Sequence, residues 1–315
     1  MNHSFPKKIQ NILITCGSGS GPIYLARSLQ KKYKVFLVDG SSQGVAPHLG
    51  FPFEVVPFGN SPEYIPAIQK LVKKWNIHCI VPGADEELAE VLKFCQKVGI
   101  LCVLPQNIEF IELCLNKSAL MKALAKEGIS KLLPFKNQRD VVYPAVAKPN
   151  RGRGSREVHV IKNQGEMTGY LKLYGKKWSD LLVQPYIGGD EYTVSVVQNN
   201  LNVTIGIVPK LVISKRGITR VAVSEDNKEI KKVCEEIIKT FSPRGPFNVQ
   251  LKVWKGKVYI FEINPRLSTT TVLTDKVFGN EVELYVSSYN QEHLKRLPKM
   301  KKGVYLYRYE ENVFR

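Results

Sequence analysis

The chain has 315 residues, of which 43% are hydrophobic and 23% charged, and it carries a formal net charge of +18. This composition is that of a globular protein and excludes the disordered and fibrous classes, and the length is enough for two or three subdomains with cores of their own. The apolar run at residues 12–15 is broken by glycines, and no stretch approaches the ~18 apolar residues of a membrane span. We therefore expect a cytoplasmic protein without a membrane partner.

The charged residues and the cysteines indicate the kind of partner and the compartment. The lysines are spread along the whole chain, which favours small anionic partners such as nucleotides. Nucleic acid is the less favoured alternative, because the sequence has no RNP-like motif and no zinc finger. The six cysteines form no CxxC pair and the five histidines are scattered, so we expect reduced core cysteines and no zinc site. For the oligomeric state, an isologous homodimer is the default expectation.

The N-terminal third predicts a doubly wound parallel sheet, because short apolar strands alternate with helices of 3.6-residue periodicity. The expected strands are residues 11–15, 33–39, 54–57, 77–81 and 100–104, and the expected helices include residues 23–32 and 64–75. Pro105-Gln106-Asn107 marks a domain boundary.

A glycine-rich loop follows the first strand. Gly17, Gly19 and Gly21, together with Asp39 at the end of the second strand, suggest a dinucleotide site. The spacing, however, is GxGxG rather than GxGxxG, and Pro22 stands in the first helical turn, so we favour a loop without a nicotinamide cofactor. Whether these glycines contact a substrate is left open.

Two acids follow the strand at residues 77–81. Asp85 and Glu86 are expected in the first turn of a helix, where acids offset the helix dipole. The alternative is that one of them lines a substrate cleft and binds an amine.

The middle of the chain carries basic residues and glycines near expected strand ends. A helix over residues 116–127 begins with Lys117 in its first turn, and Lys148 ends a strand. The loop that follows contains Gly152, Gly154 and Ser155, and glycine lets backbone N–H groups approach phosphate oxygens. Arg151, Arg153 and Arg156 add positive charge to this loop. An RNA-contacting loop and a flexible hairpin are the alternatives.

A hairpin is predicted at residues 247–266, FNVQLKVWKGKVYIFEINPR. Glu262 and Asn264 are two residues apart on its second strand, so they share a face. A two-residue turn at Lys255-Gly256 would place Gln250 on the other face, whereas a three-residue turn ending in a left-handed Gly256 brings it to theirs.

We predict the three-residue turn because it separates a polar face from an apolar one. The polar face would hold Gln250, Lys252, Glu262 and Asn264. The apolar face would hold Val249, Leu251, Val253, Tyr259, Phe261 and Ile263. Three converging side-chain oxygens suit Mg²⁺, with Mn²⁺ as an alternative.

A Gln on one strand, followed by Glu-x-Asn-Pro-Arg at the end of the next, resembles the metal-binding core of the ATP-grasp superfamily, and is most similar to the carbamoyl-phosphate synthase large-chain branch. The residues concerned are Gln250, Glu262, Asn264 and Arg266. The resemblance implies an α/β fold with a doubly wound N-terminal domain, residues 1–107, and a two-part ATP-grasp unit. Its parts would be a lid with the glycine-rich loop, residues 108–183, and a C-terminal subdomain with the metal site, residues 184–315.

The same resemblance implies the roles of individual residues. The ATP contacts would be Lys117, Lys148, Gly152, Gly154, Ser155, Gln184, Tyr186, Ile187 and Glu191, and the metal ligands would be Gln250, Glu262 and Asn264. Arg266 and Lys210 would be catalytic, and Arg220 is expected on a strand lining the same cleft. Many relatives carry an acid where this chain has Gln184.

The resemblance implies an ATP-dependent ligase. A carboxylate substrate would attack the γ-phosphorus of ATP, and an amine would displace phosphate from the resulting acyl phosphate, releasing ADP and phosphate. One alternative is a carbamoyl-phosphate-synthase-like module that phosphorylates bicarbonate or carbamate. Another is a nucleotide-binding or nucleic-acid-binding module without catalysis. The sequence names neither the carboxylate nor the amine.

Overall fold

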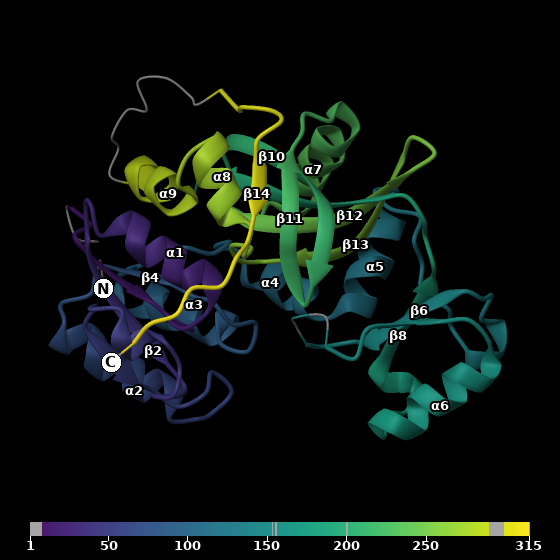
Figure 1. Ribbon diagram of the computed structural model, residues 1–315, viewed down its shortest axis with the longest axis horizontal. Coiled ribbons are helices and arrows are strands. Elements are labelled where there is room, and N and C mark those ends of the chain that lie inside the picture. Colours follow the sequence, from purple (N-terminus) through teal and green to yellow (C-terminus); the bar gives the residue numbers. More distant parts are fainter. Residues whose placement is uncertain (1–7, 153, 155, 200, 290–298, 315) are drawn as a thin grey trace.

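The computed structural model describes residues 8–152, 154, 156–199, 201–289 and 299–314. Within these residues the strands form a parallel sheet, a small antiparallel sheet and a large antiparallel sheet. Figure 1 shows the parallel sheet and its helices (purple and blue) at one side of the molecule, the large antiparallel sheet in the middle and the small antiparallel sheet with helix α6 (teal) at the other side.

The parallel sheet is doubly wound, as the sequence predicts. Its strand order is β3-β2-β1-β4-β5, so the order reverses between β1 and β4. Apolar residues of β1 alternate between two cores, with Ile12 and Ile14 on one face of the sheet and Leu13 on the other. The elements are β1 (Asn11–Ile14), α1 (Ser20–Leu29), β2 (Lys34–Asp39), β3 (Phe53–Val55), α2 (Tyr64–Lys74), β4 (Cys79–Val81), α3 (Leu88–Val98) and β5 (Leu101–Cys102).

Asp85 and Glu86 lie before α3, not in its first turn. The helix begins at Leu88, because residues 85–87 still form the turn that leaves β4. The prediction that these acids offset the helix dipole from inside the first turn is therefore wrong in its placement.

Two helices lead from the parallel sheet to the rest of the chain, α4 (Ile108–Leu115) and α5 (Lys117–Lys126). Each begins with an asparagine cap: the side chain of Asn107 accepts a hydrogen bond from Phe110 N, and that of Asn116 accepts one from Ala119 N. The domain boundary predicted at 107/108 falls at the first of these caps.

The small antiparallel sheet has the order β7-β6-β8 and packs against α6. The elements are β6 (Ala145–Pro149), β7 (His159–Ile161), α6 (Gln164–Tyr174) and β8 (Leu181–Pro185). All five residues of β8 pair with β6, so the boundary predicted between residues 183 and 184 falls inside a strand of this sheet.

The large antiparallel sheet has the order β13-β12-β9-β10-β11-β14. Its core against α4, α5 and α7 contains Val194, Val249 and Phe247. The elements are β9 (Asp190–Gln198), β10 (Thr204–Arg216), β11 (Ile218–Ser224), α7 (Lys228–Phe241), β12 (Phe247–Trp254), β13 (Lys257–Asn264), α8 (Thr271–Val277), α9 (Glu281–Tyr289) and β14 (Tyr305–Tyr307). After β14 the tail returns over the parallel-sheet domain, where Glu311 forms an ion pair with Arg27 of α1 (Figure 1).

The β12–β13 hairpin has a different turn from the predicted one. Trp254 pairs with Lys257, and Lys255 and Gly256 both have positive φ, which is a two-residue turn. The register shifts later: Leu251 pairs with Ile260 but Gln250 pairs with Glu262, which leaves Phe261 as a bulge.

The bulge brings Gln250 opposite Glu262 as predicted, but by a different route. Because the shift comes at Phe261 and not at the turn, Tyr259 pairs with Lys252 and lines the same cavity as Lys252 and Glu262. Phe261 lines that cavity as well. The assignment of Tyr259 and Phe261 to the apolar face is therefore wrong.

Two further observations bear on the environment of the chain. Five of the six cysteines are buried and none of the six is in a disulfide, as predicted. Among the described residues there is no helix with the length and apolarity needed to cross a membrane.

Candidate active site

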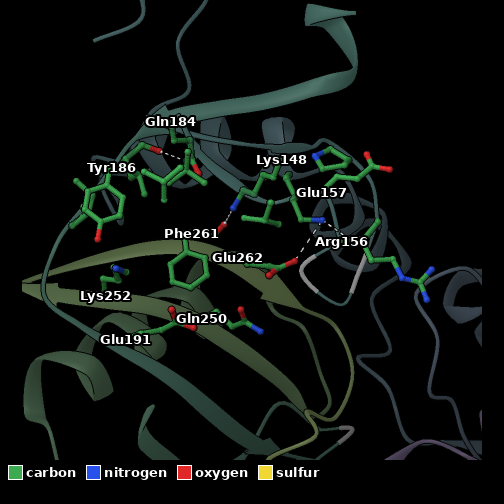
Figure 2. A pocket seen from close by; sticks show the side chains of 18 of the residues that line it. Lys148, Arg156, Glu157, Gln184, Tyr186, Glu191, Gln250, Lys252, Phe261 and Glu262 are labelled. Atoms are coloured by element: carbon green, nitrogen blue, oxygen red, sulfur yellow. Dashed lines mark hydrogen bonds and ion pairs between the residues drawn. The ribbon is translucent and has the colours of Figure 1, made fainter. Parts of the chain in front are cut away.

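A cavity of about 390 Å³ lies between the small and the large antiparallel sheets, and we call it the inter-sheet cavity. Figure 2 shows Lys148 and Gln184 facing it from the small sheet, and Glu191, Gln250 and Glu262 facing it from the large one. Its lining includes Lys117, Val146, Lys148, Arg151, Gly152, Arg156, Gln184, Tyr186, Ile187, Glu191, Lys215, Gln250, Lys252, Tyr259, Phe261 and Glu262.

Two buried lysines reach across this cavity. The Lys148 ammonium donates a hydrogen bond to the carbonyl of Phe261 (2.9 Å), the bulge residue whose extra carbonyl is available for a partner outside the strand pair. The Lys117 ammonium donates to the carbonyl of Gly152 (2.6 Å) and lies 3.4 Å from a Glu262 oxygen. Burial lowers the pKa of Lys148 to about 8, and the Glu262 carboxylate offsets this only in part.

Positive charge dominates the inter-sheet cavity. Among the lining residues that the structure describes, the basic side chains are Lys117, Lys148, Arg151, Arg156, Lys176, Lys215 and Lys252, and the acidic ones are Glu86, Glu157, Glu191 and Glu262. Glu191 forms an ion pair with Lys215 (2.9 Å), and the Lys252 ammonium lies 5.1 Å from the ring centre of Tyr186. A cavity with this excess of cations suits a polyanionic ligand.

Polar side chains occupy one face at the start of β12 and the end of β13. Gln250 pairs with Glu262, and Asn248 pairs with Asn264, so the four side chains share a face. Asn264 donates to Asn248 (3.4 Å), and Asn248 donates to the carbonyl of Arg266 (2.8 Å). Sequence reasoning missed Asn248, although its position two residues before Gln250 on the same strand was the available signal.

This donor set fits a cation that shares its coordination with a ligand. In the described part of the chain, no cluster of three or more His, Cys, Asp or Glu side chains could hold a metal on its own. Glu262 supplies one carboxylate, and the neighbouring Gln250 supplies an amide oxygen on the same face. Mg²⁺ is commonly held in this way, by one or two carboxylates together with water and substrate phosphates.

The predicted ATP contacts are brought together to a large extent. Lys117, Lys148, Gly152, Gln184, Tyr186, Ile187 and Glu191 line the inter-sheet cavity. Gly154 is exposed with φ +73° and does not line it, while Ser155 and Arg153 lie outside the described residues. Of the predicted metal ligands, Gln250 and Glu262 line the cavity, whereas Asn264 is buried beside Asn248.

Gln184 is oriented by the backbone. Its side chain is buried, and its amide nitrogen donates to the carbonyl of Leu132 (3.1 Å). Because a carbonyl oxygen can only accept a hydrogen bond, this contact turns the amide nitrogen of Gln184, and not its amide oxygen, toward Leu132.

Arg266 is held by an acid of the parallel-sheet domain. Its Nε donates to Asp85 (2.6 Å) and its Nη1 to the carbonyl of Leu267 (3.2 Å). Burial alone would lower the pKa of Arg266, but the Asp85 carboxylate and, further away, Glu262 outweigh this and leave the pKa above its ordinary value. The Arg266 side chain is absent from the described lining of the inter-sheet cavity, and its ion pair joins the segment that follows β13 to the turn before α3.

Lys210 does not lie in the cleft, so that prediction is wrong. Its side chain is fully buried and donates to the hydroxyls of Ser195 (2.6 Å) and Thr274 (2.7 Å). Burial lowers its pKa to about 8, with Glu281 acting in the opposite direction. Arg220 is paired with Glu310 (3.0 Å), and neither Arg220 nor Lys210 is among the described residues that line the cavity.

A second cavity of about 340 Å³ lies at the carboxyl ends of the parallel strands, and we call it the strand-end cavity. Glu86 and Arg156 line both cavities, so the two share a wall. The lining of the strand-end cavity is Thr15, Cys16, Val38, Asp39, Gly40, Val56, Pro57, Phe58, Gly59, Asn60, Tyr64, Ala84, Glu86, Glu87 and Arg156.

Glu87 organises the floor of the strand-end cavity. Its buried carboxylate accepts hydrogen bonds from the Thr15 hydroxyl, from the backbone N–H groups of Gly83 and Ala84, and from the Tyr64 hydroxyl. Burial and the Glu87 charge together raise the pKa of Tyr64. Sequence reasoning did not single out Glu87, because the neighbouring Asp85 and Glu86 are acids in the same run after the predicted strand.

The glycines after β1 bring the chain close to other elements. Gly17 lies against β2, where a Cβ would meet Leu37 at 3.1 Å, and Gly21 lies against Thr269. Beside them, Asp39 accepts a hydrogen bond from Ser18 N (2.9 Å).

The comparison with family models and the comparison with curated proteins each found a match to this chain. Residues 114–270 match the ATP-grasp domain model. The carbamoyl phosphate synthase large chain of Pseudothermotoga lettingae is 23% identical over 88% of this chain. The match covers 28% of that relative, so the chain spans little more than a quarter of its length.

Solved structures share the fold over most of the chain. The N5-carboxyaminoimidazole synthetase of Staphylococcus aureus, solved in complex with ADP, has a TM-score of 0.74 at 19% identity and covers 92% of this chain and 80% of its own. The L-amino acid ligase of Bacillus licheniformis has a TM-score of 0.71 at 17% identity and covers 93% of this chain and 78% of its own. The family match thus identifies residues 114–270 as an ATP-grasp domain, and the solved structures share the fold of the chain that contains it.

Proposed function

We propose that this protein is an ATP-dependent ligase that joins a carboxylate to an amine through an acyl phosphate and releases ADP and phosphate. The observation that carries the proposal is the inter-sheet cavity, in which Lys117 and Lys148 face Gln250 and Glu262 from opposite sides. The similar proteins named above support it, since one is an L-amino acid ligase and another was solved with ADP.

ATP is expected to lie along the cavity with its base toward the small sheet. Tyr186 and Ile187 connect β8 to β9 and line the cavity beside the buried Gln184, which makes an apolar site with one polar group for adenine. Glu191 at the start of β9 would face the ribose. Lys117 and Lys148 would hold the phosphates, together with the backbone at Gly152.

Gln250, Glu262 and Asn264 would hold Mg²⁺, and Mn²⁺ could take the same oxygen ligands. The ion would neutralise charge on the β- and γ-phosphates during transfer. Asn264 pairs with Asn248 in the described state, so the ligand that lies directly beside Glu262 on the cavity wall is Gln250.

Catalysis would consist of positioning and charge neutralisation. An oxygen of the substrate carboxylate attacks the γ-phosphorus, and the bond from that phosphorus to the β–γ bridging oxygen breaks to release ADP. Lys148 and Lys117 would compensate the charge of the transferring group. Arg266 remains our candidate for stabilising the acyl phosphate, because Asp85 fixes its guanidinium where the Glu262 carboxylate acts on it electrostatically.

The test is ADP release from ATP and Mg²⁺ with a panel of carboxylates and amines. Glu262→Ala is expected to abolish turnover with the pair that is active in the wild type. The matched control is Glu235→Ala, which removes an exposed carboxylate from α7 that lines neither cavity. Near-normal ADP release from Glu262→Ala would remove this mechanism, and tight ATP binding without turnover across the panel would favour a non-catalytic nucleotide-binding module.

A second candidate function is phosphorylation of bicarbonate or carbamate, because the curated relative named above is a carbamoyl phosphate synthase large chain. Bicarbonate-dependent ATP hydrolysis in the absence of any other carboxylate would support it. We also propose a cytoplasmic location and a homodimer. The reduced cysteines support the location, and sedimentation of the purified chain tests the dimer.

A further inference from the structure

The strand-end cavity adjoins the inter-sheet cavity. Glu86 from the turn before α3 and Arg156 from the glycine-rich loop line both, so a molecule in one cavity meets a molecule in the other across a shared wall. Figure 2 shows Arg156 at the edge of the inter-sheet cavity, beside Glu157. A two-substrate reaction needs this kind of juxtaposition, in which each reactant has a site and the reacting atoms meet between them.

The position of this cavity in the fold also favours a ligand. Thr15 follows β1 and Ala84 follows β4, and these are the neighbouring strands between which the order of the parallel sheet reverses. In open α/β sheets, ligands bind at the carboxyl ends of the strands at this point. A volume of about 340 Å³ is near the lower end of the range for small-molecule sites, roughly 300–1,000 Å³, so the ligand is small.

The charges of the strand-end cavity select the kind of ligand. Glu87 is already engaged by the Thr15 and Tyr64 hydroxyls and by two backbone N–H groups, so the protein itself uses that carboxylate. Asp39 lines the strand-end cavity and not the inter-sheet cavity, and its carboxylate accepts a hydrogen bond from the neutral backbone N–H of Ser18. No Lys or Arg forms an ion pair with Asp39 in the described part of the chain.

We propose that the strand-end cavity binds the amine acceptor of the ligase reaction, and that this acceptor is a small diamine. One ammonium group would pair with Asp39, away from the shared wall. The other nitrogen would lie at the shared wall, beside Glu86 and Arg156, where it faces the inter-sheet cavity. The proposal rests on the ligase function proposed above.

The chemical step balances with the reactants named. The lone pair of the amine nitrogen attacks the acyl carbon, and the bond from that carbon to the phosphate oxygen breaks. The departing phosphate takes the proton that the nitrogen loses, so the products are an amide and hydrogen phosphate.

The first experiment measures binding and does not depend on turnover. Calorimetry of 1,4-diaminobutane with the full chain is expected to show a saturable site whose affinity falls at least tenfold in Asp39→Asn. This variant keeps an oxygen acceptor for Ser18 N and removes the charge. The matched control is Glu90→Gln, an exposed acid of α3 paired with Lys93 outside the cavity, which is expected to bind as the wild type does. Absence of binding, or equal binding by Asp39→Asn, would overturn the proposal.

The second experiment separates this proposal from the ligase function. With ATP, Mg²⁺ and the active carboxylate, hydroxylamine traps an acyl phosphate as a hydroxamate, which reports the first half-reaction without the amine. We expect 1,4-diaminobutane to exceed n-butylamine at least tenfold in kcat/KM, and Asp39→Asn to remove that preference while hydroxamate formation stays unchanged.

Each departure from this result has its own meaning. No hydroxamate from the wild type with any carboxylate counts against the ligase function. Hydroxamate formation with equal use of the two amines overturns the diamine proposal alone. A loss of hydroxamate in Asp39→Asn would instead place the carboxylate in the strand-end cavity, and tight binding of a dinucleotide to Asp39 would make it a ribose contact. Both outcomes would also overturn the proposal.

Discussion

The Lys117 ammonium lies 3.4 Å from the Glu262 carboxylate and donates to the carbonyl of Gly152, so one side chain joins the glycine-rich loop to the polar face of β13. A cation in the first turn of a helix is unfavourable by the dipole. These two contacts account for its position at the start of α5. The contact with Glu262 also compensates the charge of its carboxylate. On binding, the phosphates of a nucleotide would take over Lys117 and the metal ion would take over Glu262.

Lys117→Met is therefore expected to raise the KM for ATP about tenfold or more, because a phosphate contact and the counter-charge of Glu262 are lost together. Steady-state ADP release at varied ATP measures it. The control is Lys122→Met, an exposed lysine on the same helix, whose KM should stay within about twofold of the wild type. An unchanged KM in Lys117→Met would show that Lys117 holds the loop and not the phosphates.

The pKa of Lys148, lowered by burial to about 8, predicts a pH dependence of ATP binding. The phosphates require the ammonium form, so above pH 8 the free protein must take up a proton to bind ATP. Affinity should then fall by about tenfold per pH unit. A titration of ATP binding from pH 7 to pH 10 tests this.

Lys148→Arg is the matched variant for this titration. A guanidinium stays charged throughout the range, so its ATP affinity should be nearly flat with pH even where the absolute affinity is lower. The same downward slope in Lys148→Arg would assign the pH dependence to another group.

Substitution of the buried Lys210 is expected to change the stability of the protein and not its catalysis. Its pKa is about 8 in the folded protein and near 10.5 unfolded, so between these values the unfolded state binds the extra proton. As the pH increases through this window, the free energy of unfolding of the wild type should therefore rise relative to that of Lys210→Met, by up to ~3 kcal/mol. Denaturant titrations of both proteins at pH 7, 8, 9 and 10 measure the difference.

Turnover of Lys210→Met at pH 7 should remain within about threefold of the wild type, because Lys210 contacts neither cavity among the described residues. If the variant fails to fold because Glu281 is left without its cation, Lys210→Met with Glu281→Gln is the second test. A folded variant with turnover lost would return Lys210 to the active site.

Asp85 is expected to act through Arg266. Asp85→Asn keeps an acceptor for the Arg266 Nε and removes the charge, so kcat should fall about tenfold while the KM for ATP changes little. Asp85→Ala leaves the guanidinium without its partner and should also cost about 3 kcal/mol of stability. Equal losses of kcat in both variants at unchanged stability would mean that Asp85 contacts the substrate directly.

The fold was readable from the sequence where local patterns decide it. The βα alternation gives the parallel sheet, and the strand-end Lys148 and the Gln250 and Glu262 pair meet as expected. Lys210 was misplaced because alternation along a strand says which face a side chain takes, but not whether that face is covered by a helix. Here α8 covers it, and Thr274 of that helix bonds the lysine.

The pairing of distant residues was beyond local patterns. Nothing near Asp85 in the sequence indicates that Arg266 would be its partner, since the contact depends on how the parallel-sheet domain packs on the large sheet. The shared wall of the two cavities has the same origin, because Glu86 and Arg156 come from separate domains.

The bulge at Phe261 bears on how this chain should be aligned with other ATP-grasp sequences. A hairpin without the bulge residue would keep the same two-residue turn, but its ligand carboxylate would lie one residue nearer to the turn than Glu262 does. Alignments across the superfamily should therefore allow a single-residue gap between Tyr259 and Glu262. An alignment without that freedom would match Phe261 of this chain to the carboxylate of a relative and report the motif as lost.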